Sequence, residues 1–155
     1  MNVSFDAFSA STAEDVMMIS TEIYKFGTNR SLTKETPNTL SLFIEEQAGN
    51  VVQHAFKPGE KRWLDLTVMD KPDKLIIRIR DNGSPSDPLA YLSTGDAKGY
   101  GLLIVQKLAE KIEYRRNMGL NNLIVHLKSS RIPFPIIKTK QKQAPVEGAC
   151  FLLDL

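Results

Sequence analysis

The sequence lacks the features that define several other classes of protein. Its single cysteine, Cys150, excludes a disulfide within the chain, and one cysteine with two distant histidines supplies no zinc ligand cluster. No run of about 18 apolar residues is present to span a membrane. The segment from Met1 to Asp6 has no basic region followed by an apolar stretch, which argues against a secretory signal. We therefore expect a cytoplasmic protein with no membrane partner.

An excess of charge of one sign is also missing. The 155 residues include 20 basic and 18 acidic side chains, and the net charge of +2 at pH 7 is too small to favour direct binding of nucleic acid. Apolar residues make up 42% of the chain, which is ordinary for a globular protein. The length suits a single domain with a full hydrophobic core.

Hydrophobic periodicity and turn residues predict an α+β fold. Gly27 should end the first helix, and Pro37 should open the second. Residues 81–99 lack a sustained period and are expected to form a loop. The order β-α-α-β-β-α-β-β favours a two-layer α/β sandwich, with a mixed, mostly antiparallel sheet that carries its helices on one face. Strands are expected over 3–8, 63–70, 75–80, 112–117 and 122–128, and helices over 13–27, 37–56 and 101–112.

The last part of the chain differs in composition from the rest. Two prolines interrupt an apolar segment at 131–137, and three lysines follow within 138–142. We therefore divide the chain into a domain over 1–128 and a C-terminal extension over 129–155. The extension is either a tail packed on the domain or an arm that binds a partner.

The first segment that can carry chemistry lies on the second expected helix. Glu46, Asn50 and His54 recur every four residues, so they share one face that lies mostly off the apolar stripe. An acid and an amide one turn apart can hold Mg²⁺ together with phosphate oxygens, and the acid can instead accept a proton from an attacking hydroxyl. A solvated polar face is the alternative. Gly49 favours the functional interpretation, because an interior helix glycine costs about 1 kcal/mol relative to alanine and usually marks a close approach.

The second segment follows the expected strand over 75–80. Asp81 stands at the end of that strand, where a carboxylate can accept a hydrogen bond from an exocyclic amine such as that of adenine. Gly83 would let the backbone approach a flat ring. Asn82 and Gly83 alternatively form a hairpin turn, but no alternating strand follows them.

The third segment, Lys98-Gly99-Tyr100-Gly101-Leu102, directly precedes the last expected helix. Two glycines one residue apart can direct backbone amides at a phosphate, whose negative charge the helix N-terminus also favours. Lys98 would add a full positive charge. A plain flexible helix entry is the alternative, since the spacing matches neither a P-loop nor a dinucleotide-binding fingerprint.

Taken in order, the three segments resemble the motifs of the histidine-kinase-like ATPase superfamily, whose nucleotide site is the Bergerat fold. Glu46 and Asn50 match its E-x-x-x-N helix motif. Residues 81–83 match its D-x-G box, and residues 99–101 match its G-x-G box. The resemblance covers about 3–128 and implies an ATP-binding protein with this fold.

Within the superfamily, the sequence is most similar to the small anti-sigma-factor serine kinases of bacteria, which are stand-alone domains of similar length. The similarity rests on the segment EEQAGN at 45–50 with HAF at 54–56, on PSDP at 85–88 and on EYR at 113–115. It implies a protein partner, which is either a sigma factor or an antagonist of the anti-sigma factor.

The resemblance also implies a role for each matched residue. Glu46 would be the catalytic general base toward a serine of a protein substrate, and Asn50 would bind Mg²⁺ beside ATP. Asp81 would bind the adenine amine, with Gly83 packed near the ring. The segment 98–102 would contact the phosphates and complete the nucleotide site. Its members are Gly99, Tyr100, Gly101 and Leu102, together with Lys98, which we add because of its charge.

Departures from the family pattern leave the activity open. Ser86 stands where an aromatic is common, and Asn121 and Asn122 stand where a threonine often contributes near the adenine. One hypothesis is a protein-serine kinase, and a second is a nucleotide-gated module that binds its protein partner without turnover. A third is the catalytic domain of a sensor histidine kinase system, with its acceptor histidine on another chain. A homodimer is compatible with each hypothesis.

Overall fold

The computed structural model describes residues 4–29, 35–94 and 100–128. Lys98, Gly99 and the whole extension over 129–155, which the sequence analysis singled out, lie outside the described residues. None of the helices in the described part is both long and apolar enough to cross a membrane.

The described part of the chain contains five strands and four helices. The strands are β1 (Ser4–Ala10), β2 (Leu64–Asp70), β3 (Lys74–Asp81), β4 (Ala109–Asn117) and β5 (Leu120–Lys128). The helices are α1 (Ala13–Asn29), α2 (Glu35–His54), α3 (Pro88–Thr94) and α4 (Gly101–Leu108). The sequence predicted every one of these elements except α3.

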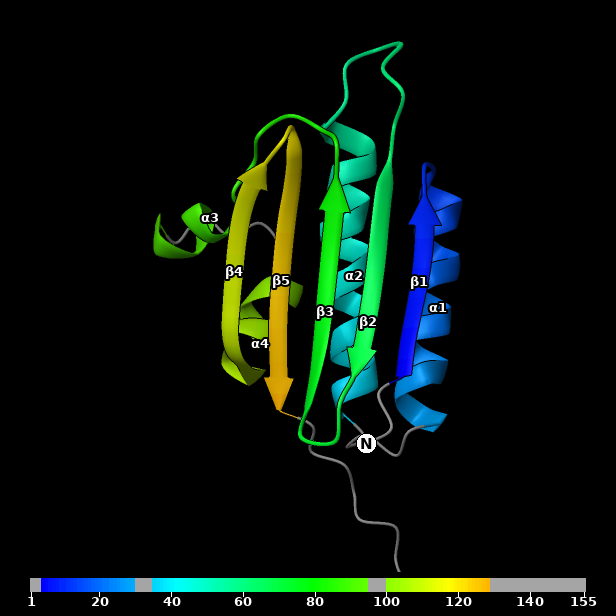
Figure 1. The fold of residues 1–155 in the computed structure, drawn as a ribbon, viewed down its shortest axis with the longest axis vertical. Helices are drawn as coiled ribbons and strands as arrows, with labels where there is room; N and C mark the ends of the chain where they lie inside the picture. The colour runs from blue at the N-terminus through cyan, green and yellow to red at the C-terminus, as the bar shows by residue number, and fades with distance from the viewer. Residues whose placement is uncertain (1–3, 30–34, 95–99, 129–155) are drawn as a thin grey trace, which may run out of the picture.

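The strands form one sheet in the order β1-β2-β3-β5-β4, and every neighbouring pair is antiparallel. Figure 1 shows α1, α2 and α4 together behind this sheet, while α3 lies beside β4. The predicted α+β class and two-layer arrangement are confirmed. The described strands contain no parallel pair, so the sheet is antiparallel rather than mixed.

Alternation along the central strands places the core on the face that the helices cover. Leu75, Ile77 and Ile79 of β3 are buried there, and Asp81 continues the same face at the end of the strand. The apolar stripe of α2 packs on this face and completes the core. In the register of β3 with β5, Asp81 lies opposite Asn121, so two polar residues meet where the apolar core ends.

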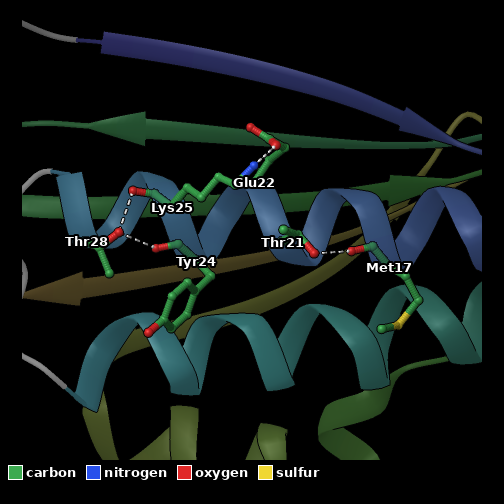
Figure 2. A network of polar contacts seen from close by, with 6 residues as sticks. All are labelled: Met17, Thr21, Glu22, Tyr24, Lys25 and Thr28. Carbon is green, nitrogen blue, oxygen red and sulfur yellow. Dashed lines mark hydrogen bonds and ion pairs between the residues drawn. The ribbon is translucent and has the colours of Figure 1, made fainter.

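Gly27 does not end α1, contrary to the prediction. The helix runs on past it, and the Thr28 hydroxyl donates hydrogen bonds to the carbonyl oxygens of Tyr24 and Lys25 in its last turn (Figure 2). A Cβ atom added to Gly27 would lie 2.9 Å from Cγ of Pro37. Glycine at this position therefore permits the close packing of α1 on the first turn of α2.

The first turn of α2 also differs from the prediction. The helix begins at Glu35, so Pro37 lies inside the first turn rather than opening it. The first amides of a helix have no partner within the helix, so a proline there removes no hydrogen bond.

The expected loop over 81–99 contains the helix α3. The Asp87 carboxylate accepts a hydrogen bond from the Leu89 amide at 2.8 Å, and Pro88 is the first residue of the helix. An aspartate at the N-cap followed by proline is a standard start signal, so the sequence did carry the information that predicts α3.

The last helix is shorter than predicted. α4 ends at Leu108, and Ala109 has an extended backbone with φ −78° and ψ 138°, where β4 begins. Ala109 and Ile112 both pack against the core from β4. Their spacing continues the helical period of α4, so periodicity alone placed this boundary too late.

Candidate functional site

A cleft of about 600 Å³ opens between α2, the end of β3, α3, α4 and the β4–β5 hairpin. This volume is ordinary for a site that holds a small organic ligand. The lining combines apolar and polar groups, so the cleft suits a flat apolar ring that carries polar edges. Its apolar side chains include Val51, Ile79, Leu102 and Leu123, and its polar ones include Asn50, His54, Asp81, Tyr114 and Asn121.

The polar face of α2 divides between this cleft and the N-terminus of α4. Asn50 and His54 line the cleft, as their spacing predicted. The hydrogen-bonding partners of Glu46 lie instead at the start of α4. A Cβ atom added at Gly49 would meet no described atom within 4 Å outside the helix itself, so the expected close approach at this glycine is absent from the described structure.

Glu46 caps α4 from another helix. Its Oε1 accepts a hydrogen bond from the Tyr100 amide at 3.0 Å, and its Oε2 accepts one from the Gly101 amide at 2.6 Å. These amides belong to the first turn, where no partner within the helix exists and the helix dipole favours a negative charge. A Cβ atom added to Gly101 would lie 2.7 Å from Oε2 of Glu46 and 2.9 Å from Cα of Phe43, so only glycine permits this approach.

Asp81 is a buried carboxylate at the floor of the cleft. Its side chain is 4% exposed, and its Oδ1 accepts hydrogen bonds from the Gly83 amide at 2.9 Å and from Nδ2 of Asn121 at 2.8 Å. Burial raises the pKa of Asp81 above its ordinary value of 3.8, although the hydrogen bonds from Asn121 and Gly83 and the charge of Arg116 act in the opposite direction. No hydrogen bond to Oδ2 is found among the described residues, so this oxygen remains available to a ligand.

Gly83 holds the turn after β3 against the end of α2. A Cβ atom added to it would lie 2.5 Å from Cβ of Ala55, and the Ser84 amide donates to the carbonyl oxygen of Ala55 at 2.8 Å. The close neighbour of Gly83 is therefore the protein backbone and Ala55. Its predicted place beside an adenine ring stays a prediction.

Tyr114 and Arg116 of the β4–β5 hairpin were missed by the sequence analysis, and Asn121 was noted only as a departure from the family pattern near the adenine. Asn121 is 5% exposed and donates to Asp81, while its Oδ1 accepts hydrogen bonds from the Tyr114 hydroxyl and from Arg116, both at 2.7 Å. Asn121 occupies the inward-facing register of β5, which is otherwise apolar. A polar residue in a buried alternating position was the signal that could have identified it.

The structure brings most of the predicted site residues together. Asn50, Asp81 and Leu102 line the one cleft. Glu46, Tyr100 and Gly101 meet where α4 starts, directly before Leu102 in the chain.

Comparison with known proteins identifies the family of the chain and agrees with the α+β fold. The family model of the histidine kinase-like ATPase domain matches residues 9–127, and the chain belongs to this family. It therefore contains a histidine kinase-like ATPase domain, and membership of this family implies ATP binding. The serine/threonine-protein kinase BtrW of Bordetella bronchiseptica is 32% identical to it. The aligned part covers 55% of this chain and spans 66% of that relative's length.

Proposed function

We propose that the chain acts as a protein-serine kinase, which transfers the γ-phosphate of ATP to a serine of a partner protein, or that it binds a sigma factor, or that it does both. The supporting observation is that Asp81 and Asn50 line one cleft. The Glu46 carboxylate, one turn before Asn50 on α2, contacts the start of α4 beside this cleft. The name of the relative, a serine/threonine-protein kinase, supports a hydroxyl acceptor on a protein.

The adenine end of the nucleotide is assigned to Asp81. Its Oδ2 would accept a hydrogen bond from the exocyclic amine, because Oδ1 already has two donors in the described structure. Val51 and Ile79, which line the same cleft, would contact the faces of the purine ring. Burial of this flat ring would supply apolar contact, and the single carboxylate would fix its orientation.

The phosphate end is assigned to Asn50 and the start of α4. The amide oxygen of Asn50 suits Mg²⁺, which prefers oxygen ligands and is commonly completed by phosphate oxygens and water. When bound, Mg²⁺ would neutralise part of the phosphate charge. The amides of Tyr100 and Gly101 would donate hydrogen bonds to phosphate oxygens. Lys98 and Gly99, predicted from the sequence, would extend this contact.

Glu46 is assigned the proton-transfer step. The serine Oγ would form a bond to the γ-phosphorus while the bond from that phosphorus to the bridging oxygen of ADP breaks, and the hydroxyl proton would pass to the Glu46 carboxylate. Both oxygens of this carboxylate accept amide hydrogen bonds in the described structure. Phosphate that takes over these amides would free the carboxylate to turn toward the serine.

The same observation favours a second candidate, a nucleotide-gated binding module without turnover. If Glu46 stays on the amides of Tyr100 and Gly101 while ATP is bound, its carboxylate is held at the start of α4 and is not free to turn toward a serine hydroxyl. The chain would then hold its protein partner under the control of nucleotide but transfer nothing to it.

Two measurements separate these candidates. Both candidate functions require a rise in melting temperature with Mg-ATP. ATP at 100 times its dissociation constant should stabilise the fold by about 2.7 kcal/mol. Transfer of labelled phosphate to a candidate antagonist protein, lost in Glu46→Gln, supports the kinase. ATP binding without transfer to any candidate supports the module, and no thermal shift at any ATP concentration excludes both.

A further inference from the structure

The Asp81 carboxylate is held by a hydrogen-bond network whose centre is Asn121. Nδ2 of Asn121 donates to Oδ1 of Asp81 at 2.8 Å and to the carbonyl oxygen of Ser84 at 2.9 Å. Arg116 donates both to Oδ1 of Asn121 at 2.7 Å and to the carbonyl oxygen of Gly83 at 3.1 Å. The network thus ties the carboxylate and the turn that follows it to the β4–β5 hairpin.

The hydrogen-bonding groups of Asn121 are fully used within the protein. Its two N–H groups face Asp81 and Ser84, and its oxygen accepts from the hydroxyl of Tyr114 and the guanidinium of Arg116. The reverse orientation of the amide would direct its oxygen at two acceptors and its nitrogen at a guanidinium, so the surroundings determine the orientation. Asn121 therefore has no group left for a ligand and can act only through Asp81.

This arrangement fixes which oxygen of Asp81 is presented to the cleft. The Gly83 amide and Asn121 both donate to Oδ1, and rotation of the carboxylate would break both hydrogen bonds. Oδ2 is thereby held in one position. Recognition of an amine by a single oxygen depends on such orientation, because a carboxylate that turns freely would lose the hydrogen-bond geometry.

We infer that Asn121, supported by Arg116, is a positioning residue that aims Asp81 at the 6-amino group of the purine and so sets the preference for adenine. The inference rests on the proposed function, because it assumes that Asp81 binds the amine. The inference goes further than that assignment, because it makes residues whose polar groups are already used within the protein determine the selectivity for adenine. If these residues only stabilised the fold, their removal would lower the affinity for every purine nucleotide by the same factor.

The groups that face Asp81 also predict a pH signature. Arg116 and Tyr114 approach from β4, His54 lines the same cleft from α2, and Tyr91 lines it from α3. Arg116 supplies the fixed positive charge that favours the ionised carboxylate. Removing that charge should move the loss of ATP affinity at acid pH to a higher pH.

The test compares ATP with purine riboside triphosphate, which has hydrogen in place of the 6-amino group. Dissociation constants for both are measured on the full chain for wild type, Asn121→Ala and Arg116→Gln. Asn122→Ala is the matched control, because Asn122 lies on the opposite face of β5 and its side chain, among the described residues, donates only to the carbonyl oxygen of Leu120 at 3.3 Å. Arg116→Gln is an exposed substitution that keeps the inference testable if Asn121→Ala does not fold.

We expect Asn121→Ala to lose roughly tenfold in affinity for ATP, the scale of one hydrogen bond to a charged group, and less than threefold for the analogue. Arg116→Gln should also lose more affinity for ATP than for the analogue, but by a smaller factor, and its ATP affinity should begin to fall at a higher pH. Asn122→Ala should match wild type. Equal losses for both nucleotides, or no loss for either, would overturn the inference. A wild-type chain that binds neither nucleotide would overturn the proposed function itself.

Discussion

The amide nitrogen of Gly101 lies 2.6 Å from Oε2 of Glu46, so the start of α4 already holds an anion that the protein itself supplies. The residue expected to act as base and the backbone expected to bind phosphate are thus partners in the described structure. In the proposed kinase, phosphate and the Glu46 carboxylate would compete for the same amides, because both are anions that a helix N-terminus stabilises. Nucleotide binding and release of the base are therefore coupled in the proposed kinase.

This competition predicts opposite effects of Glu46→Gln on binding and on transfer. Removing the charge should raise ATP affinity roughly twofold to fivefold, since a charge at a helix N-terminus is worth about 0.3–1 kcal/mol. Phosphate transfer should fall at least about 100-fold, because the general base is lost. The free energy of unfolding without nucleotide should fall by about 1–2 kcal/mol. Titration calorimetry, phosphate transfer and thermal melts measure the three effects.

Glu45→Gln is the matched control for this variant. Glu45 neighbours Glu46 in the chain but accepts a hydrogen bond from Oγ of Ser20 on α1 at 2.6 Å. We expect wild-type transfer from this variant once ATP is saturating. Equal loss of transfer from Glu45→Gln, or weaker ATP binding by Glu46→Gln, would contradict the competition.

Asp81→Asn should separate ATP binding from folding. The asparagine oxygen can still accept the hydrogen bonds of Gly83 and Asn121, so the fold should be kept. The neutral amide cannot attract the adenine amine in the same way, and ATP affinity should fall roughly 10- to 100-fold. Calorimetry with ATP and a thermal melt of the unliganded chain check the two parts. ATP binding at the wild-type level would remove Asp81 from the site.

The raised pKa of Asp81 gives this variant a pH signature. Burial makes the folded protein hold the proton more tightly than the unfolded chain, so the contribution of Asp81 to stability is fully present below pH 3.8 and is lost as pH rises through the folded pKa. ATP affinity should follow the opposite course, because the ionised carboxylate accepts the amine hydrogen bond more strongly than the protonated group does. Asp81→Asn should flatten both dependences, as melts and titrations across acidic pH would reveal.

Two glycines of the predicted motifs should respond to alanine in opposite directions. Gly101→Ala places a Cβ atom 2.9 Å from Cα of Phe43 and should cost about 1–3 kcal/mol of unfolding free energy. Gly49→Ala enters open space within a helix and should stabilise the unliganded chain by about 0.5–1 kcal/mol. Chemical denaturation of both variants measures the difference. A destabilised Gly49→Ala would show that this glycine has a packing role.

Much of the fold could be predicted because its signals are local. The alternation of Leu75, Ile77 and Ile79 marks β3, and the start of α4 follows directly from the glycine segment before it. The boundary between α4 and β4 failed because Ala109 and Ile112 satisfy both a helical and a strand pattern. Pairing of β4 with β5 determines the outcome there, and that contact is not visible in local periodicity.

The site was predictable where spacing alone defines it. The four-residue spacing predicted one shared face of α2 for Glu46, Asn50 and His54; Asn50 and His54 line the cleft, whereas Glu46 contacts the start of α4. The hydrogen bond from the Gly101 amide to Glu46 and the one from Asn121 to Asp81 join residues that are distant in the chain. No local pattern specifies such partners, so the sequence identified Glu46 and Asp81 without indicating what holds them.

Asn50→Ala tests the assignment of the metal. If Asn50 is a Mg²⁺ ligand, its loss should reduce the gain in ATP affinity that Mg²⁺ provides. We expect a reduction of at least roughly tenfold, which is typical of removing even an outer-shell partner of a metal. Binding of ATP in the presence of a chelator should change little. Gln53→Ala, an exposed substitution on the same helix outside the cleft lining, serves as the control. An unchanged response of Asn50→Ala to Mg²⁺ would contradict the assignment.

We further propose that residues 1–128 form the ATPase domain and that 129–155 is an extension to it. The family match ends at residue 127, β5 ends at Lys128, and the described residues that line the cleft all precede both points. A chain ended after Lys128 should therefore unfold cooperatively and bind ATP within about threefold of the full chain, since no described contact of the site is removed. Melts and ATP titrations of the two chains check this, and loss of ATP binding would show that the extension completes the site. A lower melting temperature with ATP affinity kept would identify a packed tail, whereas an unchanged melt with weaker partner binding would identify an arm.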